Sequence, residues 1–360
     1  MEYQILVINP GSTSTKIAIY HNEKLLFEEN ISHSTEELSK YERIIDQLDF
    51  RKEMVIKTVK EKGFSLEELD AIVARGGLLR PLSGGTYRIN QQMVNDLKEG
   101  VQGEHASNLA GLIAFDLASK LNIPAFTVDP VAVDEFIPEA RISGIPEIER
   151  RSLSHALNIK ATARQAARDL NLSFSECNFI VAHLGGGISI APLLKGRIVD
   201  VNNANESGPF SPERCGQLPV GDLVRLAFSG KYTFRELKKR MVGQGGLTAY
   251  LGTNNCQEIE EKIKAGDEKV AEVYHAMIYQ IAKEIGAMAT VLKGEVDAII
   301  LTGGLAHSKM VTDGITEYVQ YIAPVKVYPG AMEMLALCQG ALRVLRREEE
   351  PLEYIVEGVK

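Results

Sequence analysis

The chain has 360 residues, of which 45% are apolar, and a formal net charge of −8 at pH 7. This length suits two globular domains better than one, and no run of about 18 uncharged apolar residues could span a membrane. The acidic balance excludes a general attraction to nucleic acid or anionic lipid. Any bound anion must therefore be held by a local cluster of donors.

Cysteine usage and the first residues indicate the cellular compartment. The four cysteines are scattered without a C-x-x-C pair, which argues against a zinc site and against a disulfide framework. The first residues, MEYQILVINP, carry an acidic residue and no basic segment before the apolar run, so they do not predict a signal peptide. We therefore expect a cytoplasmic protein. The cysteines are Cys177, Cys215, Cys256 and Cys338.

The first predicted elements are two strands joined by a turn rich in Gly, Ser and Thr, QILVINPGSTSTKIAIY at residues 4–20. Gly11 permits a tight turn. Ser12 and Ser14 offer hydroxyl and backbone donors to phosphate oxygens, and Lys16 adds a positive charge. The G-x-x-x-x-G-K spacing of a Walker A loop is absent, and the turn leads into a strand. Taken alone, the segment is either a phosphate-binding turn or an ordinary hairpin.

The same succession of strand, turn and strand is repeated later in the chain. Residues 179–194, FIVAHLGGGISIAPLL, have the same order of strand, turn and strand. The three glycines 185–187 let backbone N–H groups approach an anion. A second pair of similar segments follows in matching order, ELDAIVARGGLL from Glu68 and EVDAIILTGGLA from Glu295. Two duplicated landmarks predict two related α/β halves, each with a phosphate-sized turn, and a cleft between the two lobes.

The spacing of the landmarks predicts the domain boundaries. The second pair is separated by roughly 50 residues more than the first, which indicates an insertion at about 203–266. We expect a first lobe at 1–152, to which 336–360 return, and a second lobe at 153–335. Irregular material of this kind beside a phosphate site often shapes a substrate pocket.

Helical and strand periodicities alternate along both halves. Apolar stripes predict helices at 108–121, 267–292 and 331–347. Short strand-like runs lie between them, which predicts α/β layers. These runs are LVIN, KIAIY, AFTVD, FIVAHL and AIILTGG.

The two segments that begin at Glu68 and Glu295 differ in their charged residues. Gly303 and Gly304 follow a buried strand, where backbone can lie flat against a nucleotide, although such glycines also end strands. The corresponding ARGGLLR segment adds Arg75 and Arg80. These arginines are either surface ion pairs or donors to an anion. The divergence suggests that one half holds adenosine and the other faces an acidic substrate.

Several longer motifs resemble the acetate kinase family of acyl-phosphate-forming kinases, in the actin-like ATPase superfamily, and most closely its butyrate kinase branch. This resemblance implies two duplicated actin-like (ribonuclease H-like) domains, ATP and Mg²⁺ as cofactors, and a homodimer or higher homo-oligomer. The motifs are INPGSTSTK, ARGGLLRPLSGGTY, GEHASNLAG, TVDPVAVDE, SLSHALN, AHLGGGISIAP, SPERCGQLPVGD, ILTGGLAHS and PGAMEMLAL.

The resemblance also implies roles for single residues. Contacts to ATP or phosphate fall to Asn9, Ser12, Ser14, Lys16, His183, Gly185, Gly186, Gly187, Gly303 and Gly304. Catalytic roles fall to Arg214, Arg75, His105, His155 and Asp129, and Mg²⁺ would be held by Glu333 and Asn9. Each of the following has a structural alternative: a helix cap for His105, a core histidine for His155, a strand end for Asp129 and a helix start for Glu333.

Three positions depart from the acetate kinase pattern. A family arginine falls on Ile72, so Arg75 must supply that charge. A family histidine falls on Arg151, and a family asparagine on Gly186. These changes resemble the butyrate kinase pattern and disfavour acetate as the preferred acid.

A carboxylic acid is already ionised at neutral pH, so its attack on phosphorus needs no general base. The obstacle is repulsion between anions, because two like charges ~4 Å apart cost roughly 4 kcal/mol at an effective dielectric of about 20. Positioned cations and Mg²⁺ should therefore dominate catalysis. The predicted reaction is butyrate + ATP ⇌ butyryl phosphate + ADP.

Other acceptors and functions fit the same motifs. Acetate, propionate or a branched acid such as isobutyrate would need only a different pocket. A sugar or polyol kinase would need a base for a neutral hydroxyl, a role that Asp129 could take. A non-catalytic ATP-binding module would leave Arg214 and the arginines of ARGGLLR without a purpose.

Overall fold

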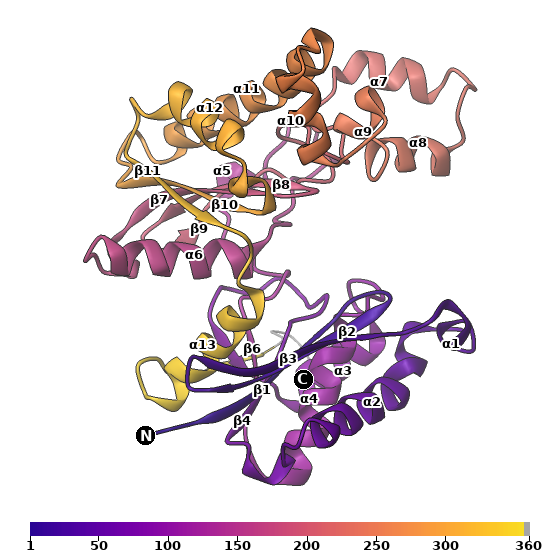
Figure 1. The fold of residues 1–360 in the computed structure, drawn as a ribbon, viewed down its shortest axis with the longest axis vertical. Helices are drawn as coiled ribbons and strands as arrows, with labels where there is room; N and C mark the ends of the chain where they lie inside the picture. The colour runs from indigo at the N-terminus through magenta and orange to yellow at the C-terminus, as the bar shows by residue number, and fades with distance from the viewer. Residues whose placement is uncertain (356–360) are drawn as a thin grey trace. The chain divides into compact units, whose positions relative to one another are not determined.

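Two mixed β-sheets organise the chain, and each lies in its own unit (Figure 1). This computed structural model describes residues 1–355. The first unit joins Met1–Asp134 to the segment that begins at Met332, and the second unit is Glu135–Ala331. The divisions expected from the sequence lie near residues 152 and 335.

The sheet of the first unit has seven strands in the order β12-β5-β6-β4-β1-β2-β3. β1, β4 and β6 run parallel, while β2 and β3 continue the sheet as an antiparallel meander. β4 and β6 are buried along their whole length and β1 along most of it, as expected for strands covered on both faces. The strands are β1 (Gln4–Pro10), β2 (Ser14–His21), β3 (Lys24–Ser32), β4 (Ala71–Ala74), β5 (Thr86–Arg88), β6 (Ala125–Val128) and β12 (Leu352–Glu353).

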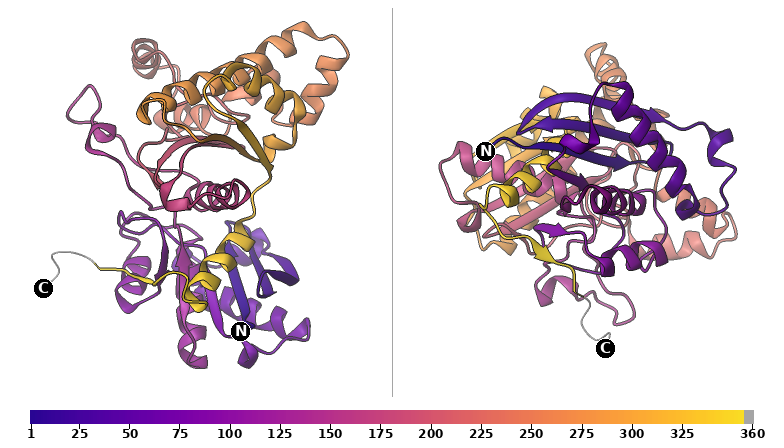
Figure 2. Two further views of the ribbon diagram at one scale, coloured as in Figure 1. Left: turned by 90° about the vertical axis from the view of Figure 1, so that its left-hand side faces the viewer. Right: turned by 90° about the horizontal axis from the view of Figure 1, so that it is seen from below.

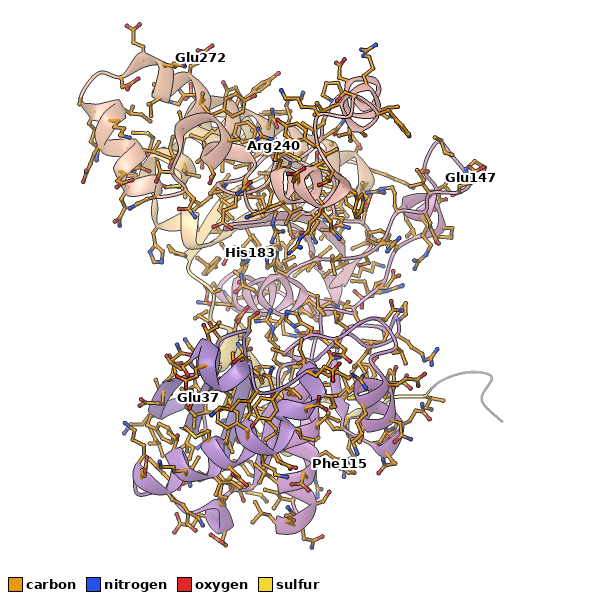
Figure 3. The ribbon with its side chains drawn as sticks, turned by 90° about the vertical axis from the view of Figure 1, so that its right-hand side faces the viewer. Glu37, Phe115, Glu147, His183, Arg240 and Glu272 are labelled. Atoms are coloured by element: carbon orange, nitrogen blue, oxygen red, sulfur yellow. The ribbon has the colours of Figure 1, made fainter. Side chains whose placement is uncertain are left out.

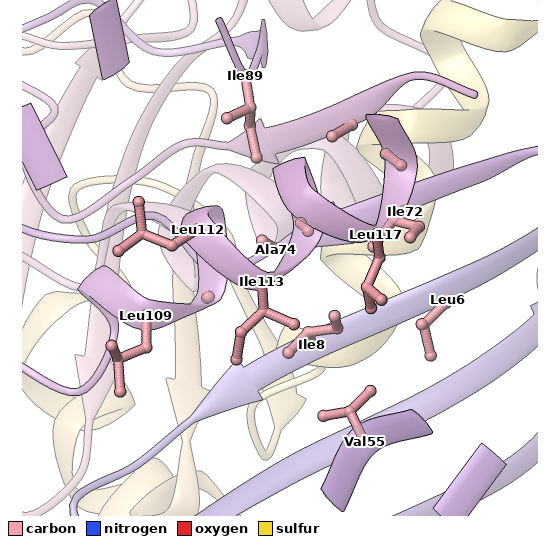
Figure 4. Packing of buried hydrophobic residues seen from close by; sticks show 14 of the residues in the cluster. Leu6, Ile8, Val55, Ile72, Ala74, Ile89, Leu109, Leu112, Ile113 and Leu117 are labelled. Carbon is pink, nitrogen blue, oxygen red and sulfur yellow. The ribbon is translucent and has the colours of Figure 1, made fainter. Parts of the chain in front are cut away.

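Helices cover both faces of this first sheet. α2 (Leu48–Glu61) and α4 (Asn108–Leu121) pack on one face, and α13 (Glu333–Leu345) packs on the other. The short α1 (Thr35–Leu38) follows β3, and α3 (Gln91–Glu99) packs against α4. Figure 4 shows Leu109, Ile113 and Leu117 of α4 beside Ile8 of β1 in the apolar core.

The sheet of the second unit has five strands in the order β11-β10-β7-β8-β9. β7, β10 and β11 run parallel, and β8 and β9 again form an antiparallel meander. The strands are β7 (Asn178–Leu184), β8 (Ile188–Leu194), β9 (Arg197–Ile198), β10 (Ala298–Gly303) and β11 (Val325–Pro329).

The helices of the second unit also form two layers (Figures 1 and 2). α6 (Ala156–Asp169) covers one face of the sheet, and α11 (Glu268–Val291) and α12 (Lys309–Val319) cover the other. Four helices lie between β9 and α11, where the sequence predicts inserted residues. They are α7 (Val220–Ala227), α8 (Phe234–Met241), α9 (Gly246–Leu251) and α10 (Cys256–Lys264), and the short α5 (Pro138–Arg141) precedes α6.

Matched contacts confirm that the two halves are duplicated. Asp70, just before β4, accepts a hydrogen bond from Gln4 N at 2.7 Å. Asp297, just before β10, accepts one from Asn178 N at 2.7 Å. The order of the corresponding strands is also the same, since β3-β2-β1-β4-β6 matches β9-β8-β7-β10-β11. The α/β prediction is therefore correct, and both turns named from the sequence lie at the carboxyl edges of parallel strands.

No helix within residues 1–355 is long and apolar enough to cross a membrane.

Candidate functional site

The turn between β1 and β2 in the first unit is fixed by an arginine of α2. Arg51 is 1% exposed, and its guanidinium donates to three carbonyl oxygens of the turn: Gly11 at 2.9 Å, Ser12 at 2.9 Å and Ser14 at 3.0 Å. The remaining carbonyl, that of Thr13, accepts from His33 N at 2.9 Å. The side chains of Ser12 and Thr13 are exposed. The turn can therefore present hydroxyl and N–H groups to an anion.

Asn9, Arg75 and Glu333 come together at the carboxyl edge of β1 and β4. Asn9 Nδ2 donates to Glu333 Oε2 at 3.0 Å, and Arg75 Nη1 pairs with the same oxygen. Both charged side chains are partly exposed, with 32% and 28% of their area accessible. Glu333 begins α13, where the helix dipole favours a carboxylate. This cluster brings three of the predicted site residues within reach of one ligand.

His105 lies at the start of α4, close enough to Arg75 to be affected by its charge. Its Nδ1 accepts from Ser107 N at 3.2 Å and pairs with Ser107 Oγ at 2.8 Å. Partial desolvation and the Arg75 cation lower the pKa of His105, so the ring is neutral at pH 7. Since Nδ1 accepts, Nε2 carries the proton and can donate to an oxygen anion.

Asp129 follows β6 and holds a neighbouring loop. It is 1% exposed, and its Oδ1 accepts from Gly85 N at 2.8 Å while its own N–H donates to Gly85 O at 3.0 Å. Its φ of 38° is in the left-handed region, which Asp tolerates better than most residues. At least one carboxylate oxygen of Asp129 is thus committed to the protein backbone.

Two cations named from the sequence are engaged with carboxylates. Lys16 Nζ lies 3.2 Å from Glu28 Oε1 on β3. Arg80 Nε donates to Asp96 Oδ2 at 2.9 Å, and the same oxygen accepts from Tyr354 OH at 2.8 Å. Of the two roles considered for Arg80, the structure shows the ion pair. Through the shared oxygen of Asp96, Arg80 also helps to hold Tyr354 of the C-terminal segment.

In the second unit, Arg214 lies against the glycine turn between β7 and β8. A Cβ atom at Gly187 would stand 2.2 Å from Arg214 Nη1, so only glycine leaves room for the guanidinium. Desolvation lowers the pKa of Arg214, although arginine remains charged at neutral pH. Within residues 1–355 the Arg214 guanidinium has no hydrogen bond or ion pair. A half-buried cation with unused donors is suited to an anionic ligand.

The backbone around Arg214 is tied to the same glycine turn through Ser211. Arg214 N donates to Ser211 Oγ at 3.1 Å, and that hydroxyl donates to Gly186 O at 2.5 Å. Leu247 N in turn donates to Ser211 O at 3.1 Å. The inserted segment is thus anchored to the turn at the backbone of Arg214.

His155 and His183 stack beside this turn, with ring centroids 4.0 Å apart and planes 13° from parallel. His183, labelled in Figure 3, is the last residue but one of β7, and its Nδ1 lies 2.8 Å from Asn158 Nδ2. An amide nitrogen only donates, so Nδ1 accepts and Nε2 carries the proton. That Nε2 is 3.3 Å from the position of a Cβ at Gly185. His155 Nδ1 pairs with Ser189 Oγ at 2.9 Å, which holds the stack in place.

Gly303 and Gly304 differ in their surroundings. A Cβ at Gly303, where φ is 91°, would meet Leu184 O at 2.3 Å, and Gly303 exchanges backbone bonds with Gly330 at 3.0 and 2.9 Å. A Cβ at Gly304 would meet nothing within 4 Å. Gly303 is therefore required by the protein itself, and Gly304 is open to a ligand.

The donor set at Asn9 and Glu333 fits Mg²⁺. This ion takes one or two protein oxygens and completes its octahedron with water and substrate phosphate. Asn9 uses its amide nitrogen toward Glu333, which leaves its carbonyl oxygen available. No group of three or more His, Cys, Asp or Glu side chains within residues 1–355 could hold a metal ion. The ion would therefore depend on phosphate oxygens of the substrate.

Arg51, Ser211 and Asn158 are site-supporting residues that the sequence did not reveal. Arg51 lies far from its turn in the sequence and looks like an ordinary charged residue of a helix. Ser211 and Asn158 lie within motifs that carry the family resemblance, SPERCGQLPVGD and SLSHALN. Their place in those motifs was a signal, but their partners could be read only from the structure.

Comparisons with known proteins agree with this arrangement. Residues 147–323 match the model of the acetokinase family. Acetate kinase from Porphyromonas gingivalis superposes with a TM-score of 0.77 at 19% identity, covering 95% of this chain and 100% of that chain. A propionate kinase from Francisella tularensis subsp. tularensis SCHU S4 gives 0.71 at 18%, covering 94% and 98%. Acetate kinase from Entamoeba histolytica gives 0.72 at 16%, covering 94% and 99%.

Identities this low establish the fold, and the family model adds a similarity in sequence within the second unit. With two duplicated mixed sheets and a phosphate-sized turn at the corresponding edge of each, the chain has the two-domain actin-like ATPase fold, and its residues 147–323 are similar in sequence to the acetokinase family.

Proposed function

We propose that this protein is an ATP-dependent carboxylate kinase that forms butyryl phosphate and ADP from butyrate and ATP. Arg214 carries the proposal, because its half-buried guanidinium lies on a glycine turn and has no hydrogen bond or ion pair within residues 1–355. Its natural partner is an anion that arrives with the substrates. The similarity of residues 147–323 to the acetokinase family supports a carboxylate as the acceptor.

The chemistry needs charge stabilisation more than proton transfer. An oxygen of the ionised acid attacks the γ-phosphorus of ATP, the bond to the β,γ-bridging oxygen breaks, and ADP leaves with the electron pair. No proton has to move, since the acid is ionised at pH 7. Arg214, Arg75 and the Nε2–H of His105 are the groups that would offset the repulsion between the two anions.

Asn9 and Glu333 would hold Mg²⁺ together with phosphate oxygens. When bound, the ion neutralises charge that develops on the phosphate oxygens. Arg75 shares Glu333 with this site, since its Nη1 pairs with Glu333 Oε2. Arg75 and Asn9 therefore both hold the carboxylate, through the same oxygen.

Butyrate is proposed over acetate because of the three departures from the acetate kinase pattern. Ile72 is 0% exposed within β4, so it cannot substitute for the arginine that acetate kinases place there. The nearest cation in sequence, Arg75, follows the strand and pairs with Glu333. We therefore propose that the shift of the positive charge from position 72 to Arg75 goes together with a larger pocket for the acyl group. Acetate, propionate and isobutyrate are the alternative acceptors, and one methylene is worth only about 1–3 kcal/mol.

A sugar or polyol kinase is the main rival of another class. It would need a carboxylate base, and Asp129 is the candidate. The bond from Gly85 N to Asp129 Oδ1 and the burial of this residue weaken that role. We also propose that the enzyme acts in the cytoplasm as a homodimer or higher homo-oligomer, as the family resemblance implies.

The test is to trap acyl phosphate with hydroxylamine, using MgATP and straight acids of two to five carbons together with isobutyrate. The readout is kcat/KM for each acid. A maximum at butyrate supports the full proposal. A maximum at acetate or propionate keeps the carboxylate kinase and corrects the acid. Absence of a trapped product with every acid, despite ATP binding, would overturn it.

A further inference from the structure

Arg51 lies behind the turn between β1 and β2, residues 11–14, which is called the phosphate turn below. This buried cation has no anion beside it within residues 1–355. All side-chain hydrogen bonds of Arg51 go to neutral acceptors: the carbonyls of Gly11, Ser12 and Ser14, Thr15 Oγ1 at 3.2 Å, and Gln47 Oε1 at 2.9 and 3.0 Å. No carboxylate forms an ion pair with Arg51 anywhere in residues 1–355. Burial of an uncompensated charge is costly. An anionic ligand bound at the turn would lower this cost.

The turn itself indicates what that ligand is. Arg51 draws three of its carbonyl oxygens to one side, and His33 N takes the fourth. The backbone N–H groups of Ser12 and Thr13 make no hydrogen bond to any residue in 1–355. Successive free N–H groups in a tight turn form a concave anion site. The oxygens of the turn are thus occupied, and its donors are unused.

His33, which packs behind the same turn, does not add a second positive charge. Its Nε2 pairs with Thr15 Oγ1 at 2.8 Å, and its ring packs edge-on against Phe50 with centroids 5.3 Å apart. Desolvation and the Arg51 cation lower the pKa of His33, so the ring is neutral at pH 7. The single positive charge behind the turn is therefore that of the guanidinium.

We propose that Arg51 is a positioning residue for a bound phosphate group. Its guanidinium orients residues 11–14 so that their N–H and hydroxyl groups face the phosphate, and its buried charge is balanced when phosphate is present. The inference rests on the proposed function only in naming a phosphate of ATP or acyl phosphate as the occupant. Phosphate binding at the turn can be tested whatever the acceptor is.

The experiment compares Arg51→Lys and Arg51→Met with a matched core variant, Val55→Ala. Val55 is 0% exposed and one turn further along α2, but it makes no bond to the phosphate turn. Two readouts are measured on the full chain: kcat/KM for MgATP in the trapping assay, and amide exchange of peptide 9–16 with and without inorganic phosphate or MgATP. Lysine keeps the positive charge but lacks the planar guanidinium. Comparing Arg51→Lys with Arg51→Met therefore separates the effect of the hydrogen-bond geometry from the effect of the charge.

Both Arg51 variants should lower kcat/KM for MgATP about 100-fold, the scale of a misplaced site. They should also lose the protection that phosphate gives to peptide 9–16, while KM for the acid and both readouts in Val55→Ala stay near wild type. If Arg51→Met does not fold, the proposal is tested with Arg51→Lys and with Gln47→Leu, which removes the two hydrogen bonds that Gln47 Oε1 accepts from the guanidinium. Unchanged protection and activity in a folded Arg51 variant would overturn the proposal.

The two hypotheses fail differently. If no acid is phosphorylated but phosphate still protects peptide 9–16 in an Arg51-dependent way, the carboxylate kinase is wrong and the positioning role stands. If acyl phosphate forms normally in the Arg51 variants, the positioning role is wrong and the kinase stands.

Discussion

Arg214 occupies the space that a side chain at Gly187 would need. A Cβ atom there would stand 2.2 Å from Nη1 and 2.4 Å from Cζ of Arg214, both far inside van der Waals contact. The glycine turn therefore serves two purposes, because it exposes backbone donors and provides the surface on which the guanidinium lies. The identity of Gly187 and the position of Arg214 cannot change independently.

Gly187→Ala should displace the Arg214 guanidinium without unfolding the second unit. We expect kcat to fall at least ~100-fold, the scale of one lost charge-stabilising group, with a small change in Tm. The control is Gly286→Ala in α11, where a Cβ would meet nothing within 4 Å. Alanine there should slightly stabilise the helix. Equal activity of the two variants would contradict the role given to the contact.

Arg214→Ala should reduce kcat by at least ~100-fold and leave ATP binding nearly intact, because in the proposed mechanism the arginine stabilises charge in the transition state more than in the ground state. Arg214→Lys should recover only part of the loss, since an ammonium lacks the guanidinium fork. Nucleotide affinity is measured by calorimetry and turnover by acyl phosphate trapping. Near-normal turnover of the alanine variant would refute the catalytic assignment.

Gly303 and Gly304 should respond oppositely to alanine. Gly303→Ala forces a side chain onto Leu184 O at 2.3 Å with φ at 91°, so we expect a stability loss of at least about 1–3 kcal/mol from backbone strain alone. Gly304→Ala has open space around its Cβ and should keep wild-type stability. If Gly304 faces the nucleotide, its variant should instead raise KM for ATP. Urea unfolding and initial rates on both variants separate the structural glycine from the binding one.

The features that sequence could predict are those encoded by local patterns repeated in order. The strands around residues 4–20 and 179–194 and the helix at 108–121 have the residue types that their burial requires, and the structure places them accordingly. The equivalence of Asp70 and Asp297 follows from ELDA and EVDA, since each aspartate binds the backbone of the first strand of its half.

The supporting interactions could not be predicted because they join distant segments through polar atoms. Nothing in the periodicity of α2 distinguishes Arg51, which is buried, from the exposed lysines of the same helix. Likewise, Lys16 and Arg80 look like anion-binding residues by motif, but each pairs with a carboxylate, Glu28 and Asp96 respectively. Motif position identifies the chemistry of a residue, and tertiary contacts decide how that chemistry is used.

A buried ion pair in the second unit provides a stability test away from the site. Lys160 Nζ lies 2.9 Å from Glu135 Oε2, both side chains are 4% exposed, and Glu135 Oε2 also accepts from Ile198 N at 2.7 Å. Lys160→Met should cost about 3–5 kcal/mol because it strands a buried carboxylate. The double variant Lys160→Met/Glu135→Leu should recover part of this loss. Urea unfolding that shows the single variant as stable as the wild type would rule out the buried-pair explanation.

His33 should make stability depend on pH. Desolvation, followed by the Arg51 cation, lowers its pKa in the folded protein, and Glu37 opposes this only in part. The unfolded chain therefore binds a proton at His33 near pH 6.5 that the folded chain does not. The free energy of unfolding should be constant with respect to this group above about pH 7 and should decrease as pH falls below about 6.5.

His33→Gln removes this titration while keeping a polar partner for Thr15. Relative to wild type, the variant should gain up to about 1.4 kcal/mol per pH unit as pH is lowered from 6.5 toward the folded pKa. The matched control is His275→Gln, an exposed position on α11. Urea unfolding at several pH values between about 5 and 8 measures the difference. A difference between wild type and His33→Gln that does not vary with pH would show that the ring accepts a proton equally well in both states, and that the charge of Arg51 does not reach it.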